Sequence, residues 1–190
     1  MLRWMLLAIL AGVSARGATL LYWIEPCEPK SGSGCLAGDP ELAAWALEAW
    51  QSASNGALRL LRTEKRESAH IRVLWANGNS GLYGEARPIL VDGIEGAEVY
   101  VLPAMAREGG GDALLRETIV YLTCLHETGH ALGLPHTAAF ADIMYSFQHG
   151  GDIAEYFGRY RRQLQVRSDI RKHPGISPAD RKQLQALWKQ

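Results

Sequence analysis

The chain has no excess of charge of either sign. Its 20 Lys and Arg residues balance 20 Asp and Glu residues, so the formal net charge is zero, and the electrostatic footprint of a nucleic-acid-binding protein is missing. We find no internal repeat and no low-complexity tract, so neither a repeat architecture nor a long disordered region is expected. The 190 residues, 47% of them hydrophobic, are enough for one globular domain around one core.

The apolar run over residues 4–13 is shorter than the ~20 residues that a membrane-spanning helix needs. It follows the positive charge of Arg3 and precedes small residues at which cleavage could occur, a pattern typical of a secretory signal peptide. We therefore expect a signal over residues 1–17 and one domain over residues 18–190. The protein would then be secreted, in a periplasmic or extracellular location; the alternative is that the run stays as an uncleaved anchor.

Cysteine is scarce, with three residues in the chain. Cys27 and Cys35 flank a loop rich in Pro, Gly and Ser, which closes easily into a disulfide in an oxidising compartment. Cys124 lies two residues before His126 on a predicted helix, about 200° around its axis. We expect Cys124 to be a buried, inert thiol.

Residues 126–136 carry the pattern H-E-x-x-H-x-x-G-x-x-H. On a helix, His126 and His130 share one face, so both can bind one metal ion. Glu127 lies beside them, where it can act on a water molecule without binding the metal itself. Gly133 can take a positive φ and end the helix, so His136 can return as a third ligand. Three imidazoles with an open fourth position describe a catalytic zinc site.

Met144 and Tyr145 follow this pattern within Asp142-Ile143-Met144-Tyr145. Together the two motifs resemble the metzincin zinc metalloproteases, in which Met144 would be the structural methionine of the Met-turn. Within that clan the chain is most similar to the matrixins. Astacin-like and serralysin-like members carry a tyrosine two residues after the methionine, where this chain has Ser146. The resemblance therefore implies that Tyr145 is part of the cleft wall and not a zinc ligand.

The resemblance also implies an α+β fold, with a twisted mixed sheet of four or five strands, two main helices and a small C-terminal helical subdomain. The cleft would run between an upper part, residues 18–132, and a lower part, residues 133–190, with one catalytic zinc at its floor. The implied activity is that of a secreted endopeptidase, which hydrolyses internal bonds of an extended protein or peptide substrate. Zinc would activate a water molecule, and Glu127 would take its proton and pass it to the leaving amine.

Other features of the matrixins are absent from this chain or only partly present. Matrixins hold a structural zinc with several histidines where residues 71–125 contain none, so a second zinc is not expected. Asp92, Glu95 and Glu98 could supply oxygens to calcium, although acids near glycine turns are more often solvated. Cys27 could instead be a latency thiol that caps the zinc, but the P-R-C-G type segment of matrixin propeptides is absent.

Residue patterns predict the elements of the chain. We expect strands over residues 18–24, 57–61, 69–75 and 97–102, a glycine-rich loop over 78–88, and helices that begin near Asp39, Asp112, Asp152 and Ser177. By the resemblance, residues 97–102 form the edge strand to which an extended peptide can add. His70 is expected to be an ordinary surface or edge histidine. The basic side chains of residues 152–175 are expected to form a solvated helix face, or alternatively a basic rim that favours acidic substrates.

Two functions without catalysis remain as alternatives. The chain could be a secreted module that binds zinc and peptides without cleaving them, or a partner-dependent protein whose cleft stays blocked. The intact Glu127 argues against the first, since a pure binder has no chemical need of that carboxylate. We expect a monomer, with no nucleic-acid partner and no stable membrane span.

Overall fold

The computed structural model describes residues 17–28, 32–78, 83–109 and 111–189. Residues 1–16 of the expected signal peptide therefore lie outside the described residues. Within the described ranges, no helix combines the length and the apolar character needed to cross a membrane.

Five strands form one twisted sheet: β1 (Ala18–Ile24), β2 (Leu58–Arg62), β3 (Ile71–Trp75), β4 (Gly84–Val91) and β5 (Ile94–Val101). Their order is β2-β1-β3-β5-β4. The strands β1, β2, β3 and β5 run parallel, and β4 pairs with β5 in the antiparallel direction. Side chains alternate between the two faces of the sheet, so that Ala97, Val99 and Val101 of β5 are all buried.

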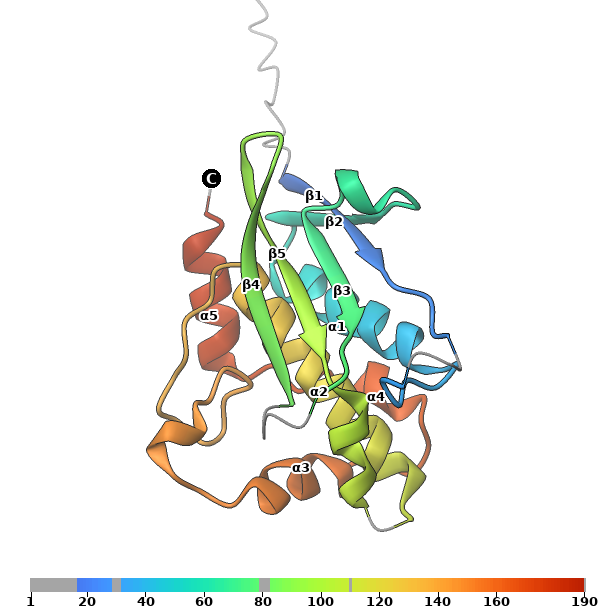
Figure 1. Cartoon of the computed structure of the whole chain (residues 1–190). Helices are drawn as coiled ribbons and strands as arrows, with labels where there is room; N and C mark the ends of the chain where they lie inside the picture. Colours follow the sequence, from blue (N-terminus) through green and yellow to red (C-terminus); the bar gives the residue numbers. More distant parts are fainter. Residues whose placement is uncertain (1–16, 29–31, 79–82, 110, 190) are drawn as a thin grey trace, which may run out of the picture.

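Two long helices cover one face of the sheet, behind it in Figure 1: α1 (Asp39–Ala53) and α2 (Ala113–Ala131). They pack against each other through Trp50, which is fully buried and donates its indole N–H to the carbonyl of Leu125 at 2.8 Å. Asp112 caps α2, since its side chain accepts the N–H groups of Leu114 and Leu115. These contacts fix the direction of α2, the helix that carries the metal-binding motif.

The chain after α2 is irregular and then helical. It contains the 3₁₀ turn η3 (Phe147–His149) and the helices α3 (Ile153–Arg161), α4 (Asp169–Lys172) and α5 (Pro178–Leu187); two further 3₁₀ segments, η1 (Arg66–Ser68) and η2 (Pro103–Gly109), lie earlier. The predicted α+β fold is confirmed: a twisted mixed sheet, two main helices and a small C-terminal helical part.

The predicted edge strand is wrong. Strand β5, which includes most of residues 97–102, lies between β3 and β4, and the edge of the sheet is β4. Residues 84–88 of the expected glycine-rich loop over 78–88 are strand, the first part of β4. Asp92 and Gly93 both have positive φ, 51° and 81°, as a two-residue type I′ hairpin turn requires. This turn pairs β4 with β5, and Pro88 suits β4 because proline within sheets is confined largely to edges and bulges.

His70 is not a surface histidine. Its side chain is buried, and Nδ1 accepts the backbone N–H of Leu21 at 3.0 Å. The residue lies just before β3, next to β1 in the sheet. The role of His70 is structural, because its ring connects β1 to the start of β3, at the point where the pairing of the two strands begins.

The basic side chains of residues 152–175 form neither a free rim nor a merely solvated face. Arg167 pairs with Glu117 of α2 at 2.6 Å and with Glu41 of α1 at 2.9 Å. Arg171 pairs with Glu48 of α1 at 2.7 Å. These ion pairs hold the C-terminal segment across the two main helices, so much of its positive charge is already matched and is not displayed to an acidic substrate.

Candidate metal centre

Three histidines converge at the end of α2. His126 and His130 lie on adjacent turns of the helix, which ends at its C-cap, Leu132. Gly133 has a φ of 88° and turns the chain back toward the helix. The Nε2 atom of His136 then lies 3.2 Å from Nε2 of His126 and 3.1 Å from Nε2 of His130. The structure therefore brings together the three residues predicted as ligands.

Backbone carbonyls fix the orientation of two of these rings. Nδ1 of His126 lies 2.6 Å from the carbonyl oxygen of Ile143, and Nδ1 of His130 lies 2.8 Å from that of Leu134. A carbonyl oxygen can only accept, so each Nδ1 carries the proton and donates it. Each Nε2 therefore presents a lone pair toward His136. Converging lone pairs repel one another unless a cation lies between them, and metal-binding histidines commonly have this arrangement.

The donor set fits zinc. With Zn–N bonds of about 2.0–2.1 Å, tetrahedral ligand atoms lie roughly 3.3 Å apart, close to the Nε2 separations observed here. Burial lowers the pKa of His126 to about 4, and burial also lowers the pKa of His130 and His136. All three imidazoles are then neutral at pH 7, the form that binds metal. His126, His130 and His136 would hold the ion.

Glu127 lies beside this cluster, with 8% of its surface exposed. The start of β4 rests on it: a Cβ atom on Gly84 would come within 2.7 Å of Cγ of Glu127. Burial, with a smaller effect from the carboxylate of Glu85, raises the pKa of Glu127 to about 8 in the metal-free protein. A cation bound by the histidines would lower the pKa of Glu127, because it favours the charged carboxylate. Glu127 is thus placed to take and return a proton.

The turn at Met144 packs against α2, the helix that carries His126 and His130. Met144 is fully buried, and a side chain on Gly129 of α2 would collide with its sulfur atom. Thr137 donates its N–H to the carbonyl of Met144 at 2.8 Å, which ties the segment after His136 to this turn. The hydroxyl of Tyr145 donates to the carbonyl of Gly150 at 2.8 Å. Tyr145 therefore stands in the wall of the site, with its hydroxyl already bonded.

Asp180 supports the same turn, a role that its position near the predicted helix start at Ser177 does not indicate. Its carboxylate is fully buried and accepts the N–H of Ile143 at 2.8 Å and the N–H of Ser177 at 3.1 Å. The carbonyl of Ile143 in turn accepts from His126. A buried acid on α5 therefore acts, through the backbone of one residue, on the orientation of a candidate ligand. The Ser-Pro-Ala-Asp capping sequence predicted the helix start, but not this long-range contact.

A pocket of about 450 Å³ opens at the histidines and Glu127. Its walls come from the start of β4, from Leu122 and Thr123 of α2, from residues 145–148, and from α3. The lining is mainly apolar and rich in aromatic rings: Tyr83, Tyr145, Phe147, Tyr156 and Phe157. Tyr83, Tyr156 and Phe157 could not be assigned to the site from the sequence, because contacts between distant segments bring them there.

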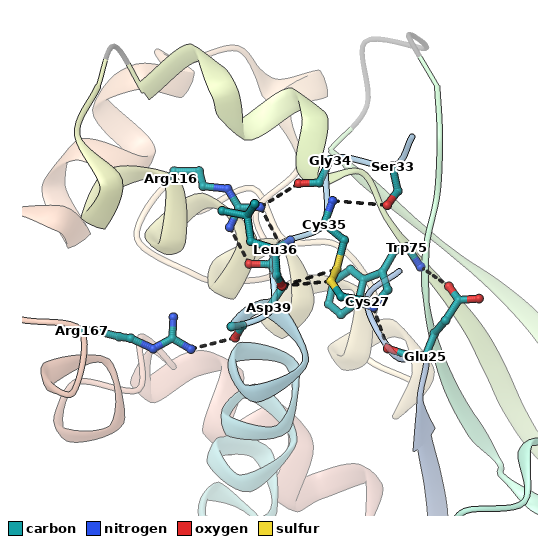
Figure 2. Close-up of a disulfide and its surroundings, with 11 residues drawn as sticks. Glu25, Cys27, Ser33, Gly34, Cys35, Leu36, Asp39, Trp75, Arg116 and Arg167 are labelled. Atoms are coloured by element: carbon teal, nitrogen blue, oxygen red, sulfur yellow. Dashed lines mark hydrogen bonds and ion pairs between the residues drawn. A yellow bond between two sulfur atoms is a disulfide. The ribbon is translucent and has the colours of Figure 1, made fainter. Parts of the chain in front are cut away.

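Cys27 and Cys35 form a disulfide in the structure, drawn in Figure 2. The alternative that Cys27 caps the zinc as a free thiol is therefore wrong. The two sulfur atoms also lie near Asp39, but both oxygens of this carboxylate are bonded to Arg116. This second cluster is structural. Cys124 is a free and fully buried thiol, and burial raises its pKa well above the ordinary value.

The proposed calcium ligands do not form a cluster in the part of the chain that the structure describes. Glu98 instead pairs with Arg66 at 3.1 Å and with Arg72 at 3.4 Å on the outer face of the sheet. Asp92 occupies the tip of the β4–β5 hairpin. The described residues thus give calcium no group of three acids to bind.

Comparisons with known proteins find similar chains among solved structures. No protein-family model matches the chain, and no curated protein matches it. Among solved structures, archaemetzincin from Methanopyrus kandleri is similar over 93% of this chain and 98% of its own, with a TM-score of 0.47 and 16% sequence identity.

Proposed function

We propose that this protein is a zinc-dependent peptidase of the metzincin type. The observation that carries the proposal is the convergence of three Nε2 atoms, within 4.8 Å of one another, in a pocket that also contains Glu127. A purely structural zinc site closes all four positions with protein ligands. Here three imidazoles face a pocket large enough for part of a substrate, which favours catalysis over structural support.

Zinc bound by three histidines supplies Lewis acidity, which polarises a carbonyl and makes a water molecule a good nucleophile at neutral pH. The protein's own groups do the rest. Glu127 takes a proton from the attacking water and delivers it to the leaving amine. The carbonyls of Ile143 and Leu134 hold His126 and His130 in their metal-binding tautomers. The edge of β4 that faces away from β5 can pair with an extended peptide.

The branch of the metzincins and the location of the protein are part of the same proposal. Ser146, in place of a tyrosine two residues after Met144, and the bonded hydroxyl of Tyr145 support a matrixin-like branch with three protein ligands. The apolar run over residues 4–13 and the Cys27–Cys35 disulfide support export to an oxidising compartment. We propose that the protein acts as a secreted monomer on extended peptides.

The test compares two alanine variants with the wild type. Glu127→Ala should keep zinc and thermal stability near the wild-type values, while hydrolysis of an unfolded protein substrate falls by about 10²-fold or more. His130→Ala should lose zinc and activity together, because a ligand is removed. Full zinc without cleavage of any peptide by the wild type would favour the binding module. Equal activity in the wild type and Glu127→Ala would overturn the role of Glu127.

A further inference from the structure

Two aromatic side chains meet across one end of the zinc pocket. Tyr83 directly precedes β4, on the sheet side of the pocket, and Phe157 lies on α3, on the opposite side. Their ring centroids are 5.2 Å apart at an angle of 56°, a favourable tilted contact. In Figure 1 the start of β4 lies near α3 at the bottom of the view. The contact therefore connects the two walls of the pocket.

The neighbouring backbone closes the same end. A Cβ atom on Gly84 would come within 2.8 Å of Cγ2 of Thr123, as well as 2.7 Å from Cγ of Glu127. The first residue of β4 thus lies directly on α2, which leaves no layer between them for a second peptide chain. Phe157 is 6% exposed, and its ring lies against that of Tyr83, which also lines the pocket.

The chemistry of Glu127 indicates which part of a substrate meets this closed end. Glu127 delivers its proton to the leaving amine, so the residues that follow the cleaved bond lie on its side of the metal. Leu122 and Thr123, one helical turn before His126 and Glu127, line the pocket together with Phe157. In the other direction, β4 runs from Glu85 to Val91 with a free edge, and can hold the residues that precede the bond.

The size and lining of the pocket restrict what fits there. A volume of about 450 Å³ lies in the lower part of the usual range for small-molecule sites. It is enough for one large side chain and a short piece of backbone. No Lys or Arg is among its described lining residues, so apolar contact with Tyr156 and Phe157 must supply the selectivity, and not a charge pair with a terminal carboxylate.

We propose, building on the peptidase function above, that Tyr83 and Phe157 close the pocket beyond the metal. The protein therefore removes short fragments from the C-terminal end of a peptide, with a large apolar residue directly after the cleaved bond. Internal bonds of long chains, which the motif alone predicts as the target, are poor substrates because the chain beyond the bond has no exit. Tyr83 and Phe157 are specificity-determining residues in this account.

A length series of peptides tests the wild-type protein first. All members share one sequence before the bond and a phenylalanine after it, followed by zero, one, two, four or eight further residues. Mass spectrometry of the products should show that cleavage falls on the order of tenfold or more beyond two further residues. Equal rates across the series would overturn the proposal. Removal of residues from the N-terminal end instead would overturn the assigned direction.

Opening the closed end should abolish this dependence on length. Tyr83→Ala and Phe157→Ala should raise cleavage of the longest peptide on the order of tenfold, with little change for the shortest. Leu61→Ala is the matched control, since Leu61 is an exposed apolar residue of β2, at the opposite edge of the sheet from β4. Thermal denaturation and zinc content show whether each variant folds. Unchanged length dependence in folded variants would contradict the role of the two rings.

Calorimetry gives a readout that does not depend on turnover. The same peptides are titrated into Glu127→Ala and into Glu127→Ala combined with Phe157→Ala. Glu127→Ala should bind the shortest peptide at least about tenfold more tightly than the longest. The double variant should bind the shortest and the longest peptide with equal affinity. If the wild type binds zinc but cleaves no peptide, the peptidase proposal fails; if length-selective binding persists in that case, the closed pocket stands. If Glu127→Ala binds peptides of every length with equal affinity, the proposed closure of the pocket by Tyr83 and Phe157 is wrong.

Discussion

The buried carboxylate of Asp180 accepts the backbone N–H of Ile143 at 2.8 Å, from a helix that begins more than thirty residues later in the chain. The carbonyl of the same Ile143 accepts Nδ1–H of His126. The backbone of one residue therefore connects the last helix to a candidate metal ligand. Such outer contacts orient ligands and commonly affect metal affinity by 10–100-fold, as an order of magnitude.

Asp180→Ala should lower both stability and zinc affinity. It leaves the N–H groups of Ile143 and Ser177 without their buried acceptor, at a cost of about 3 kcal/mol in the free energy of unfolding. Zinc affinity should fall roughly tenfold or more. Urea denaturation and competition with a chelator measure the two effects.

Asp152→Ala is the matched control for this variant. Asp152 also caps a helix with its carboxylate, but it is exposed and lies outside the turn at Met144. Its loss should cost about 1 kcal/mol and leave zinc affinity unchanged. If both variants bind zinc equally well, Asp180 does not act on the metal centre.

The metal-free protein should lose stability as the pH rises from 6.5 to 8. The folded pKa of Glu127 is about 8, above its unfolded value of about 4.5, so the folded state binds more protons in this window and its stability falls with increasing pH. The loss should reach roughly 2 kcal/mol at most. The histidines act mainly below pH 6.5, where their lowered pKa values make stability rise with pH. Urea titrations of chelated Glu127→Gln should show no loss above pH 6.5; a slope equal to that of the wild type would contradict the assignment.

Tyr145→Phe should leave zinc affinity almost unchanged. The Tyr145 hydroxyl is bonded to the carbonyl of Gly150, and the ring alone contributes to the pocket wall through Phe140 and Phe147. Competition with a chelator measures the affinity. A marked loss of metal would instead place this chain nearer to the astacin-like branch.

Peptide mapping without reduction should find Cys27 joined to Cys35 and one unmodified thiol at Cys124. Reduction should lower the free energy of unfolding by about 2–3 kcal/mol, since the bond closes a short loop. Cys124 should react with an alkylating reagent only after unfolding, because it is fully buried. A bond between Cys124 and either other cysteine would contradict the orientation of α2.

The sequence predicts the local parts of this protein well. The spacing of His126, Glu127 and His130 depends on one helix, and the capping residues Asp112 and Ser177 act within a few positions of themselves. Such signals are complete in a short stretch of sequence. The hairpin turn at Asp92-Gly93 is local in the same sense, and it pairs β4 with β5.

Long-range pairing could not be predicted in the same way. The position of β5 inside the sheet depends on β4, whose Gly84 and Pro88 suggest a loop when they are considered alone. His70 has a partner in β1, and Tyr83 meets Phe157 more than seventy residues away. These contacts depend on how separate elements pack against one another. A single sequence contains no periodic pattern that indicates this packing.

X-ray absorption of the purified, chelator-washed and zinc-reloaded protein tests the central claim most directly. We expect one zinc per chain, with three nitrogen neighbours at about 2.0–2.1 Å. Where His136→Ala still binds zinc, the ion should have two nitrogen neighbours at that distance. Near-zero zinc would contradict the proposed centre outright, and a reproducible stoichiometry of two, or sulfur in the coordination sphere, would contradict the assignment of His126, His130 and His136 as the complete ligand set.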